Sequence, residues 1–439
     1  MRLVLSLVVC VFAAAQDLST RADEYVQSWV RDGLFRGSVL VAKDGQVIFR
    51  KGYGLANEEW GNPNAPDTRF RLGSITKQFT AAAILQLAEE NKLQVTDPIS
   101  KYYTEAPAAW EKITIHHLLN HTSGIPSYTS MPDFFPKMSR DRRTPAEIVK
   151  LTQDKPLEFE PGTKHVYDNT GYILLGYVIE KVSGLSYADY LDKNIFPKAG
   201  MKESGYDLAE KIIPHRASGY TPDGKNTAFL DMSLPYAAGS LYSTVDDLLK
   251  WDQALYGGKI VRPESLAKMI TPGLNNYGYG LVIDSQSGRK RIGHGGGING
   301  FNTSMMHFPD QGVVAIALAN QNTQAVGPIT DNLAKLAFGE TVQPRPLKTE
   351  IKLPASKMDE LAGEYELRPG FILKMWRDSE KFMTQATNQG PVQAFPLSEN
   401  KFFLKVVDAE LEFERGADGR AVAVTLHQGG RDTKAPRKQ

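Results

Sequence analysis

The chain has a strand-like beginning, a long helical middle and a second strand-like region, and this order limits the folds open to it. Residues 38–54 alternate around Asp44-Gly45, a turn pair that predicts a β-hairpin. Residues 74–254 read as mainly helical, with clear helices at 172–182 and 245–255. Strand-like runs return at 280–284, 289–293, 302–307 and 313–319. We therefore predict an α+β fold in which the terminal strands form one antiparallel sheet with a large helical insertion.

The sequence pattern changes after a proline-rich segment around residues 343–354. Short alternating runs between glycine-containing turns then predict strands at 365–367, 371–376, 381–384, 402–407, 411–413 and 421–426. This spacing is typical of a small all-β barrel. We expect residues 431–439 to form a frayed polar tail.

Residues 1–15 have the features of a signal peptide. Arg2 precedes an apolar stretch at 3–11, and Ala13-Ala14-Ala15 offers a cleavage site. The apolar stretch is too short to span a bilayer. The one cysteine, Cys10, lies inside it; lipid attachment there is an alternative that the bulky Val9 disfavours. We expect an exported protein, periplasmic or extracellular, whose mature form has no disulfide and no cysteine nucleophile.

Composition excludes several classes of partner. The net charge of +1 gives no indication of nucleic-acid binding, and no later apolar run is long enough for stable membrane insertion. We expect a small-molecule or peptide substrate and leave the oligomeric state open.

Ser74 and Lys77 form a candidate nucleophile and base. They open a helix-forming run, and a serine and a lysine three residues apart share one helix face. A lysine amine in reach of a serine hydroxyl activates a weak nucleophile. The spacing alone is unspecific, since it recurs at Ser265/Lys268, Ser287/Lys290 and Ser398/Lys401.

Two further motifs are candidates to complete the site. Tyr167-Asp168-Asn169 offers a phenol as acid or base and an amide to orient substrate, although such residues before a helix also serve as turn and capping residues. His294-Gly295-Gly296-Gly297 follows a strand-like run, where glycines would let a substrate lie against the strand. The N–H groups of Ser74 and Gly297 are candidates for an oxyanion hole. The alternative is a glycine-rich loop with a surface histidine.

In this order the three motifs resemble those of the serine β-lactamase and penicillin-binding superfamily. The branch with tyrosine in the second motif contains class C β-lactamases, D-Ala-D-Ala carboxypeptidases, D-aminopeptidases and related esterases. Flanking phrases at 70–74, 118–124, 238–243 and 279–281 resemble it too. The resemblance implies a hydrolase domain at 21–340, a linker at 341–357 and a lipocalin-like barrel at 358–434.

By this resemblance, Ser74 is acylated, Lys77 and Tyr167 transfer protons, and Asn169, His294, Gly296 and Gly297 bind substrate. Which of Lys77 and Tyr167 takes the first proton stays open. Two departures matter: Asp168 replaces the usual serine, and His294-Gly295 replaces the Lys-Thr of β-lactamases. The resemblance implies a secreted serine hydrolase of an amide or ester, of the D-aminopeptidase, carboxypeptidase or esterase type. Loss of that permanent cation favours the aminopeptidase and esterase types. A true β-lactamase and a non-catalytic binding protein remain alternatives.

Other patterns are weaker. Gly295-x-Gly297-x-x-Gly300 opens no helix, so we expect no dinucleotide or other cofactor. His294-Gly295-Gly296-Gly297 also mimics a lipase oxyanion loop, but the chain has no Gly-x-Ser-x-Gly. His117 and His121 lie four residues apart without an evident third ligand, so we expect no metal.

Overall fold

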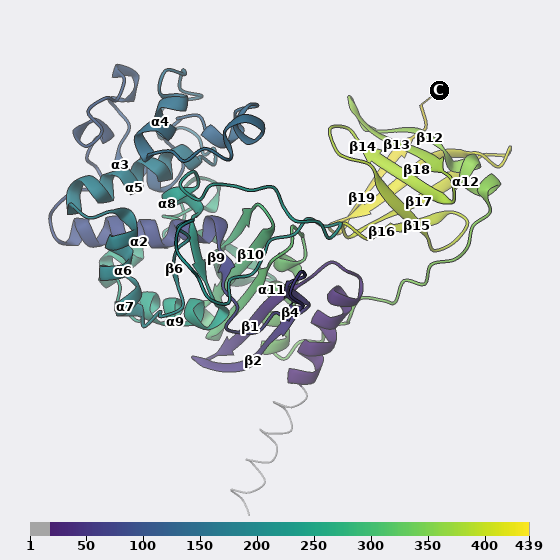
Figure 1. The fold of residues 1–439 in the computed structure, drawn as a ribbon, viewed down its shortest axis with the longest axis horizontal. Coiled ribbons are helices and arrows are strands. Elements are labelled where there is room, and N and C mark those ends of the chain that lie inside the picture. The colour runs from purple at the N-terminus through teal and green to yellow at the C-terminus, as the bar shows by residue number, and fades with distance from the viewer. Residues whose placement is uncertain (1–17, 439) are drawn as a thin grey trace, which may run out of the picture. The chain divides into compact units, whose positions relative to one another are not determined.

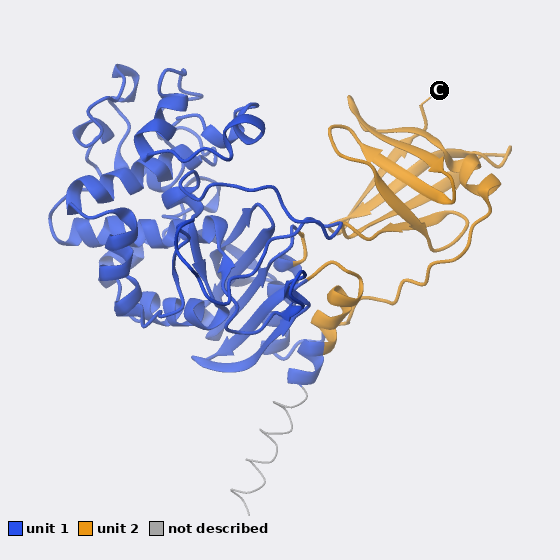
Figure 2. Cartoon of the chain, in the orientation of Figure 1, with its two compact units in different colours: residues 1–23, 36–322, 326–342 blue, residues 24–35, 323–325, 343–439 orange. Residues whose placement is uncertain are grey.

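The computed structural model describes residues 18–438. The chain divides into two compact units, one of residues 1–23, 36–322 and 326–342 and the other of residues 24–35, 323–325 and 343–439 (Figure 2). The signal peptide predicted at 1–15, with Cys10, lies outside the described residues. Within 18–438 no helix combines the length and the apolar character needed to cross a membrane.

A six-stranded antiparallel sheet organises the first unit (Figure 1). Its order is β2 (Gln46–Tyr53), β1 (Gly37–Lys43), β11 (Val313–Ala319), β10 (Phe301–Phe308), β9 (Arg289–Ile298) and β8 (Val282–Gln286). β11 is buried at every position, as its unbroken apolar sequence requires when both faces of a sheet are covered. The pairing of Gly37 with Ala319 joins the N-terminal hairpin to the last strand of the unit. The predicted α+β arrangement is confirmed.

The helical insertion lies between these strands in the chain. α2 is buried from Thr76 to Leu87, and it packs against α5 and α8. The predicted helix at 172–182 begins earlier, because Asp168 caps it at Asn169. The α-helices of the insertion are α2 (Thr76–Glu89), α3 (Ile115–Leu119), α4 (Pro145–Gln153), α5 (Asn169–Ser183), α6 (Tyr187–Asn194), α7 (Phe196–Ala199), α8 (Tyr236–Gly239), α9 (Val245–Tyr256) and α10 (Pro263–Met269).

Short elements complete the first unit. β5 (Phe70–Arg71) pairs with β7 (Leu241–Ser243), which also pairs with β6 (Gly205–Tyr206), and β3 (Leu55–Asn57) pairs with β4 (Asn62–Pro63). α11 (Val326–Ala337) packs against β11 and β10. The β5–β7 pairing places the segment after α8 beside the chain that leads into Ser74.

The second unit contains a nearly closed barrel of eight antiparallel strands in sequence order. A bridge between Tyr365 and Arg437 brings the first and last strands together. Its strands, preceded by α12 (Ala355–Leu361), are β12 (Gly363–Arg368), β13 (Phe371–Asp378), β14 (Lys381–Ala386), β15 (Val392–Pro396), β16 (Lys401–Leu404), β17 (Ala409–Arg415), β18 (Ala421–Gln428) and β19 (Arg431–Pro436).

The prediction of a frayed tail at 431–439 is wrong for most of that segment. Residues 431–436 form β19 and pair with β18 along its length. Only Ala435 of this strand is buried, so its side chains give no apolar alternation. Backbone hydrogen bonds to β18 hold the strand instead.

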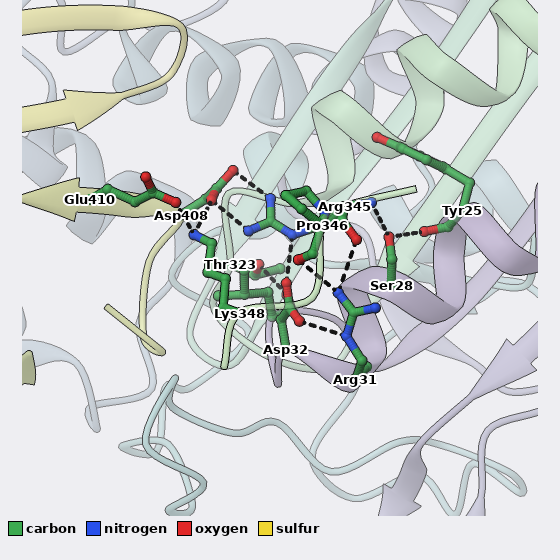
Figure 3. A network of polar contacts seen from close by, with 11 residues as sticks. Tyr25, Ser28, Arg31, Asp32, Thr323, Arg345, Pro346, Lys348, Asp408 and Glu410 are labelled. Carbon is green, nitrogen blue, oxygen red and sulfur yellow. Dashed lines mark hydrogen bonds and ion pairs between the residues drawn. The ribbon is translucent and has the colours of Figure 1, made fainter. Parts of the chain in front are cut away.

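Arg345 is the centre of a polar network within the second unit (Figure 3). Its guanidinium donates to Asp32 at 2.8 Å and to both oxygens of Asp408 at 2.6 Å. It also stacks over Trp29, 4.2 Å from the ring centroid. Lys348 extends the network to Glu410 at 2.8 Å. The contact with Asp32 joins residues 24–35 to the segment after 342, and the pair with Asp408 is bidentate, a geometry that strengthens an ion pair.

Replacing Arg345 with alanine is expected to lower the free energy of unfolding by about 1–3 kcal/mol, because Asp32 and Asp408 lose a shared partner. The measurement is urea unfolding followed by circular dichroism. The matched control is Arg377→Ala, which removes an exposed pair with Asp359 and should leave the midpoint unchanged. Equal effects of the two substitutions would contradict a structural role for the network.

Candidate active site

Ser74 lies in a 3₁₀ turn (Gly73–Ile75) directly before α2, not in the first turn of the helix itself. The residue before Ser74, Gly73, has to be a glycine for two reasons. Gly73 has a φ of +55°, and a Cβ on it would lie 2.9 Å from the backbone nitrogen of Gly297. Strand β9 can therefore lie directly against the serine turn.

Gly296 makes the same close approach from the strand side. A Cβ at this position would lie 1.9 Å from the carbonyl oxygen of Leu72, a distance that no relaxation of a side chain could relieve. The same carbonyl accepts a hydrogen bond from the Thr303 hydroxyl at 2.7 Å. β9 and β10 thus hold the chain just before Ser74 in a fixed position.

Gly296→Ala is expected to lower kcat/KM about 10²-fold, because the added methyl group displaces the chain before Ser74 and small misplacements of a nucleophile are costly. The measurement is ester hydrolysis on folded protein. Gly295→Ala is the matched control: its Cβ would meet only the Thr303 carbonyl, at 3.5 Å. Full activity in both variants would show that the contact between Gly296 and the Leu72 carbonyl does not position Ser74.

Lys77 is fully buried and its amine is surrounded by oxygen atoms. Nζ lies 3.1 Å from Ser74 Oγ, 2.8 Å from Asn169 Oδ1 and 2.9 Å from the carbonyl oxygen of Ala238. Burial lowers the pKa of Lys77 to about 7, although the charge of Asp168 opposes the shift. The amine is therefore available in its neutral form near pH 7, within reach of the serine.

Tyr167 approaches the same amine from the loop before α5. The Lys77 nitrogen lies 4.8 Å from the centroid of its ring. The ring also packs on His121, with centroids 4.3 Å apart. Burial raises the pKa of the Tyr167 phenol, and an interaction with Ser74 opposes the rise. The residue keeps 38% of its surface exposed, so solvent moderates the shift, but the phenol stays protonated at neutral pH.

Asp168 points into the protein and caps α5. Its carboxylate accepts the N–H groups of Thr170 at 2.7 Å and Gly171 at 2.9 Å. Burial raises the pKa of Asp168 to about 7, against these hydrogen bonds and the nearby Lys77. The aspartate that replaces the usual serine therefore acts on the site through its charge, behind Tyr167 and Asn169.

His294 is buried in β9, with both ring nitrogens engaged. Nε2 lies 2.9 Å from the Tyr277 hydroxyl and Nδ1 lies 2.5 Å from the Gly295 carbonyl oxygen. Its ring centroid is 6.1 Å from that of Tyr167. Burial, aided by the charge of Lys77, lowers the pKa of His294 to about 4, so the ring is neutral at pH 7.

The structure thus brings Lys77, Tyr167 and Asn169 together beside the Ser74 hydroxyl. Gly297 lies against the turn that carries Ser74. Gly296 lies against Leu72, and His294 stands behind Tyr167. His117 and His121 do not form a pair: His117 accepts the N–H of Thr114, and His121 accepts that of Asp168. Among the described residues, no cluster of histidine, cysteine or carboxylate side chains is arranged to hold a metal ion.

Sequence reasoning missed two groups in this site. The Ala238 carbonyl contacts Lys77, and a backbone oxygen leaves no mark on the sequence. Tyr277 holds His294, and its ring lies 4.7 Å from that of His121. The run Tyr277-Gly278-Tyr279-Gly280 was the available signal, because aromatic residues between glycines in a loop often serve a binding site.

A cleft of about 480 Å³, part of it open to solvent, lies beside Ser74. Its walls come from the serine turn, the segment before α4, the segment around α8 and the end of β9. Aromatic and aliphatic side chains make up most of the lining, with four polar ones among them. The lining residues are Gly73, Ser74, Tyr128, Thr129, Phe134, Phe135, Asn169, Leu230, Leu234, Pro235, Ala238, Gly239, Gly297, Ile298 and Asn299.

Comparisons with known proteins identify the family of the chain. The Beta-lactamase family model matches residues 22–339, and a model described as a domain of unknown function (DUF3471) matches 347–436. The chain is 31% identical to penicillin-binding protein 4* of Bacillus subtilis, over 92% of this chain and 95% of that protein. It is 30% identical to the teichoic acid D-alanine hydrolase of Staphylococcus aureus, over 59% of this chain and 62% of that protein.

Among solved structures, the D-amino acid amidase of Ochrobactrum anthropi SV3 superposes with a TM-score of 0.66 at 26% identity. The match covers 74% of this chain and 99% of that one. The family match at 22–339 covers most of the first unit and includes all three motifs. The chain therefore belongs to the β-lactamase family and is a serine hydrolase of the β-lactamase and penicillin-binding type.

Proposed function

We propose that this chain is an exported hydrolase that cleaves an amide or ester through an acyl-enzyme on Ser74, of the D-aminopeptidase, D-amino-acid amidase or esterase type. The observation that carries the proposal is the position of the buried Lys77 amine, 3.1 Å from Ser74 Oγ and between two other oxygen atoms. A buried amine with a pKa of about 7 is a suitable base for a serine at neutral pH.

Lys77 takes the first proton in this mechanism. A neutral amine has two N–H groups, which Asn169 Oδ1 and the Ala238 carbonyl accept, and its lone pair then faces the serine hydroxyl. As Oγ attacks the substrate carbonyl, its proton passes to Nζ. The Ser74 and Gly297 N–H groups stabilise the resulting oxyanion. Tyr167 is less suited to this step, because its raised pKa leaves little phenolate.

Tyr167 then acts as the acid. When the tetrahedral intermediate collapses, the phenol gives its proton to the leaving amine or alcohol, and the Lys77 ammonium returns a proton to the phenolate. The site is then ready for deacylation. Water repeats the sequence: its proton passes to Lys77, and Ser74 leaves with a proton from the same relay.

The leaving-group side favours substrates without a terminal carboxylate. His294 is neutral at pH 7 and already bonded to Tyr277 and to the Gly295 carbonyl, so it supplies no cation for such a carboxylate. This supports hydrolysis of an amide or ester ahead of carboxypeptidase or efficient β-lactamase activity. The relatives named as a D-alanine hydrolase and a D-amino acid amidase support the same class.

Export is the part of the proposal that rests on residues 1–15 and on the names of penicillin-binding relatives. Its test is N-terminal sequencing of the protein expressed with its leader in a bacterial host. A mature chain beginning at Gln16 in the periplasm or medium supports export, and an intact Met1 in the cytoplasm contradicts it.

The activity is tested by treating folded protein with a fluorophosphonate and with penicillin, followed by intact mass and peptide mapping. We expect an adduct on Ser74, fast with the fluorophosphonate and slow with penicillin. A parallel panel compares D-amino-acid amides, D-Ala-D-Ala peptides, short-chain esters and a chromogenic cephalosporin. Rapid cephalosporin turnover would identify a true β-lactamase. The absence of both adduct and turnover would identify a non-catalytic binding protein.

A further inference from the structure

The cleft beside Ser74 lies on the acyl side of the site. In the proposed mechanism the leaving group must reach Tyr167, and Tyr167 is not among the residues that line the cleft. The cleft is bordered instead by Ser74, Asn169 and Gly297. The part of the substrate that stays on the serine therefore occupies it.

The far wall of this cleft is aromatic and aliphatic. Tyr128, Phe134 and Phe135 form a chain of edge-to-face contacts, with centroids 4.8 Å apart for the first pair and 5.0 Å for the second. Leu230, Leu234 and Ile298 line the cleft with them. Phe135 is 48% exposed, so part of its ring surface is open to an apolar group bound in the cleft.

The polar groups of the wall already have partners. The Tyr128 hydroxyl donates to the Leu234 carbonyl at 2.7 Å. Thr129 Oγ1 accepts from the Asn169 amide at 3.0 Å, and the Asn299 amide donates to the Ala228 carbonyl at 3.0 Å. These bonds turn the hydrophobic parts of the side chains to the cleft and leave few polar atoms for a ligand.

Within the described part of the chain, the cleft lining contains no aspartate, glutamate, lysine or arginine. An ammonium or a carboxylate on the acyl group would lose water there without gaining an ion pair, which is costly. An apolar group would instead gain from burial against the rings.

We infer that the acyl side of this site takes a neutral, apolar acyl group, such as a medium-chain or aryl acyl, and that Phe135 determines this specificity. The inference rests on the proposed function and narrows it to the esterase type and to amides whose α-amino group is blocked. It separates this chain from an enzyme that binds a free α-amino group at the acyl side: N-blocked D-amino-acid derivatives and simple apolar esters fit the cleft, whereas free D-amino-acid amides do not.

The test uses the mature chain and p-nitrophenyl esters of acetate, butyrate, hexanoate, octanoate and succinate. We expect kcat/KM to rise roughly threefold for each methylene that is buried, and the anionic succinate ester to fall below butyrate. A second pair, D-alanine p-nitroanilide and its N-acetyl derivative, tests directly whether the cleft accepts an acyl group that carries an ammonium. We expect the N-acetyl compound to be preferred at least tenfold. A preference for the free amine would overturn the inference and point to cation–π binding by the aromatic wall.

Phe135→Ala supplies the structural arm of the test, since an exposed ring can be removed without opening the core. We expect the ratio of octanoate to acetate hydrolysis to fall about tenfold. The matched control is Phe229→Ala, which removes a ring that is 53% exposed and does not line the cleft, and which should leave the ratio unchanged. Hydrolysis of every ester with no dependence on chain length or charge would overturn the inference and leave the proposed function intact. Failure of every ester and of the fluorophosphonate would overturn both.

Discussion

Replacing Ser74 with alanine is expected to lower kcat/KM for the best ester or amide substrate by about 10⁴-fold or more. The reason is that Oγ is the only atom in the mechanism that forms a covalent bond to substrate. Lys77 and Asn169 keep their own hydrogen bond without it, so the fold should persist. The variant should also lose the fluorophosphonate adduct while keeping the melting temperature of the parent chain.

The chain offers a matched control for this substitution. Ser265 and Lys268 have the same spacing on α10, and neither lines the cleft. Ser265→Ala should keep full activity and full labelling. Retained labelling of the Ser74→Ala protein would show that the nucleophile is another residue and would contradict the proposed mechanism.

Much of the fold could be predicted because its signals are local. The hairpin at Asp44-Gly45 and the apolar run of β11 follow directly from side-chain pattern, and together they define the central sheet. The strand β19 could not be predicted in this way. Its first four residues are polar, and the strand exists because β18 offers an unpaired edge to its backbone.

The site could be predicted as a set of residues but not as a geometry. The spacing of Ser74 and Lys77 predicts a contact, and the structure places the two atoms 3.1 Å apart. The direction of Asp168 was open, because an aspartate before a helix can cap it or face the cleft; here it caps α5. The third oxygen around Lys77 belongs to the Ala238 backbone, which any residue would supply. No side-chain pattern encodes such a contact.

Replacing Lys77 with methionine is expected to lower kcat about 10³-fold, because a group of similar size fills the space but cannot accept the serine proton. Lys268→Met, on the exposed face of α10, is the control and should have no effect.

In the parent chain, log kcat/KM should rise with pH on an acid limb near 7, since Lys77 is inactive when protonated and active when neutral. His294 does not interfere, because its pKa of about 4 leaves it neutral throughout.

Asp168 allows the assignment of that limb to be tested. Its negative charge raises the pKa of Lys77, so Asp168→Asn removes a stabiliser of the ammonium and should shift the limb to lower pH. Asparagine remains a good helix cap, which keeps α5 in place. Asp246→Asn removes a carboxylate from the first turn of α9, where it pairs with Arg50, and should leave the limb unmoved. A limb that stays fixed in Asp168→Asn would mean that another group controls the protonation of Ser74. Loss of the limb would assign it to the Asp168 carboxyl itself, whose pKa is also raised to about 7. A limb that persists and shifts to lower pH in that variant alone would identify the buried lysine as the base.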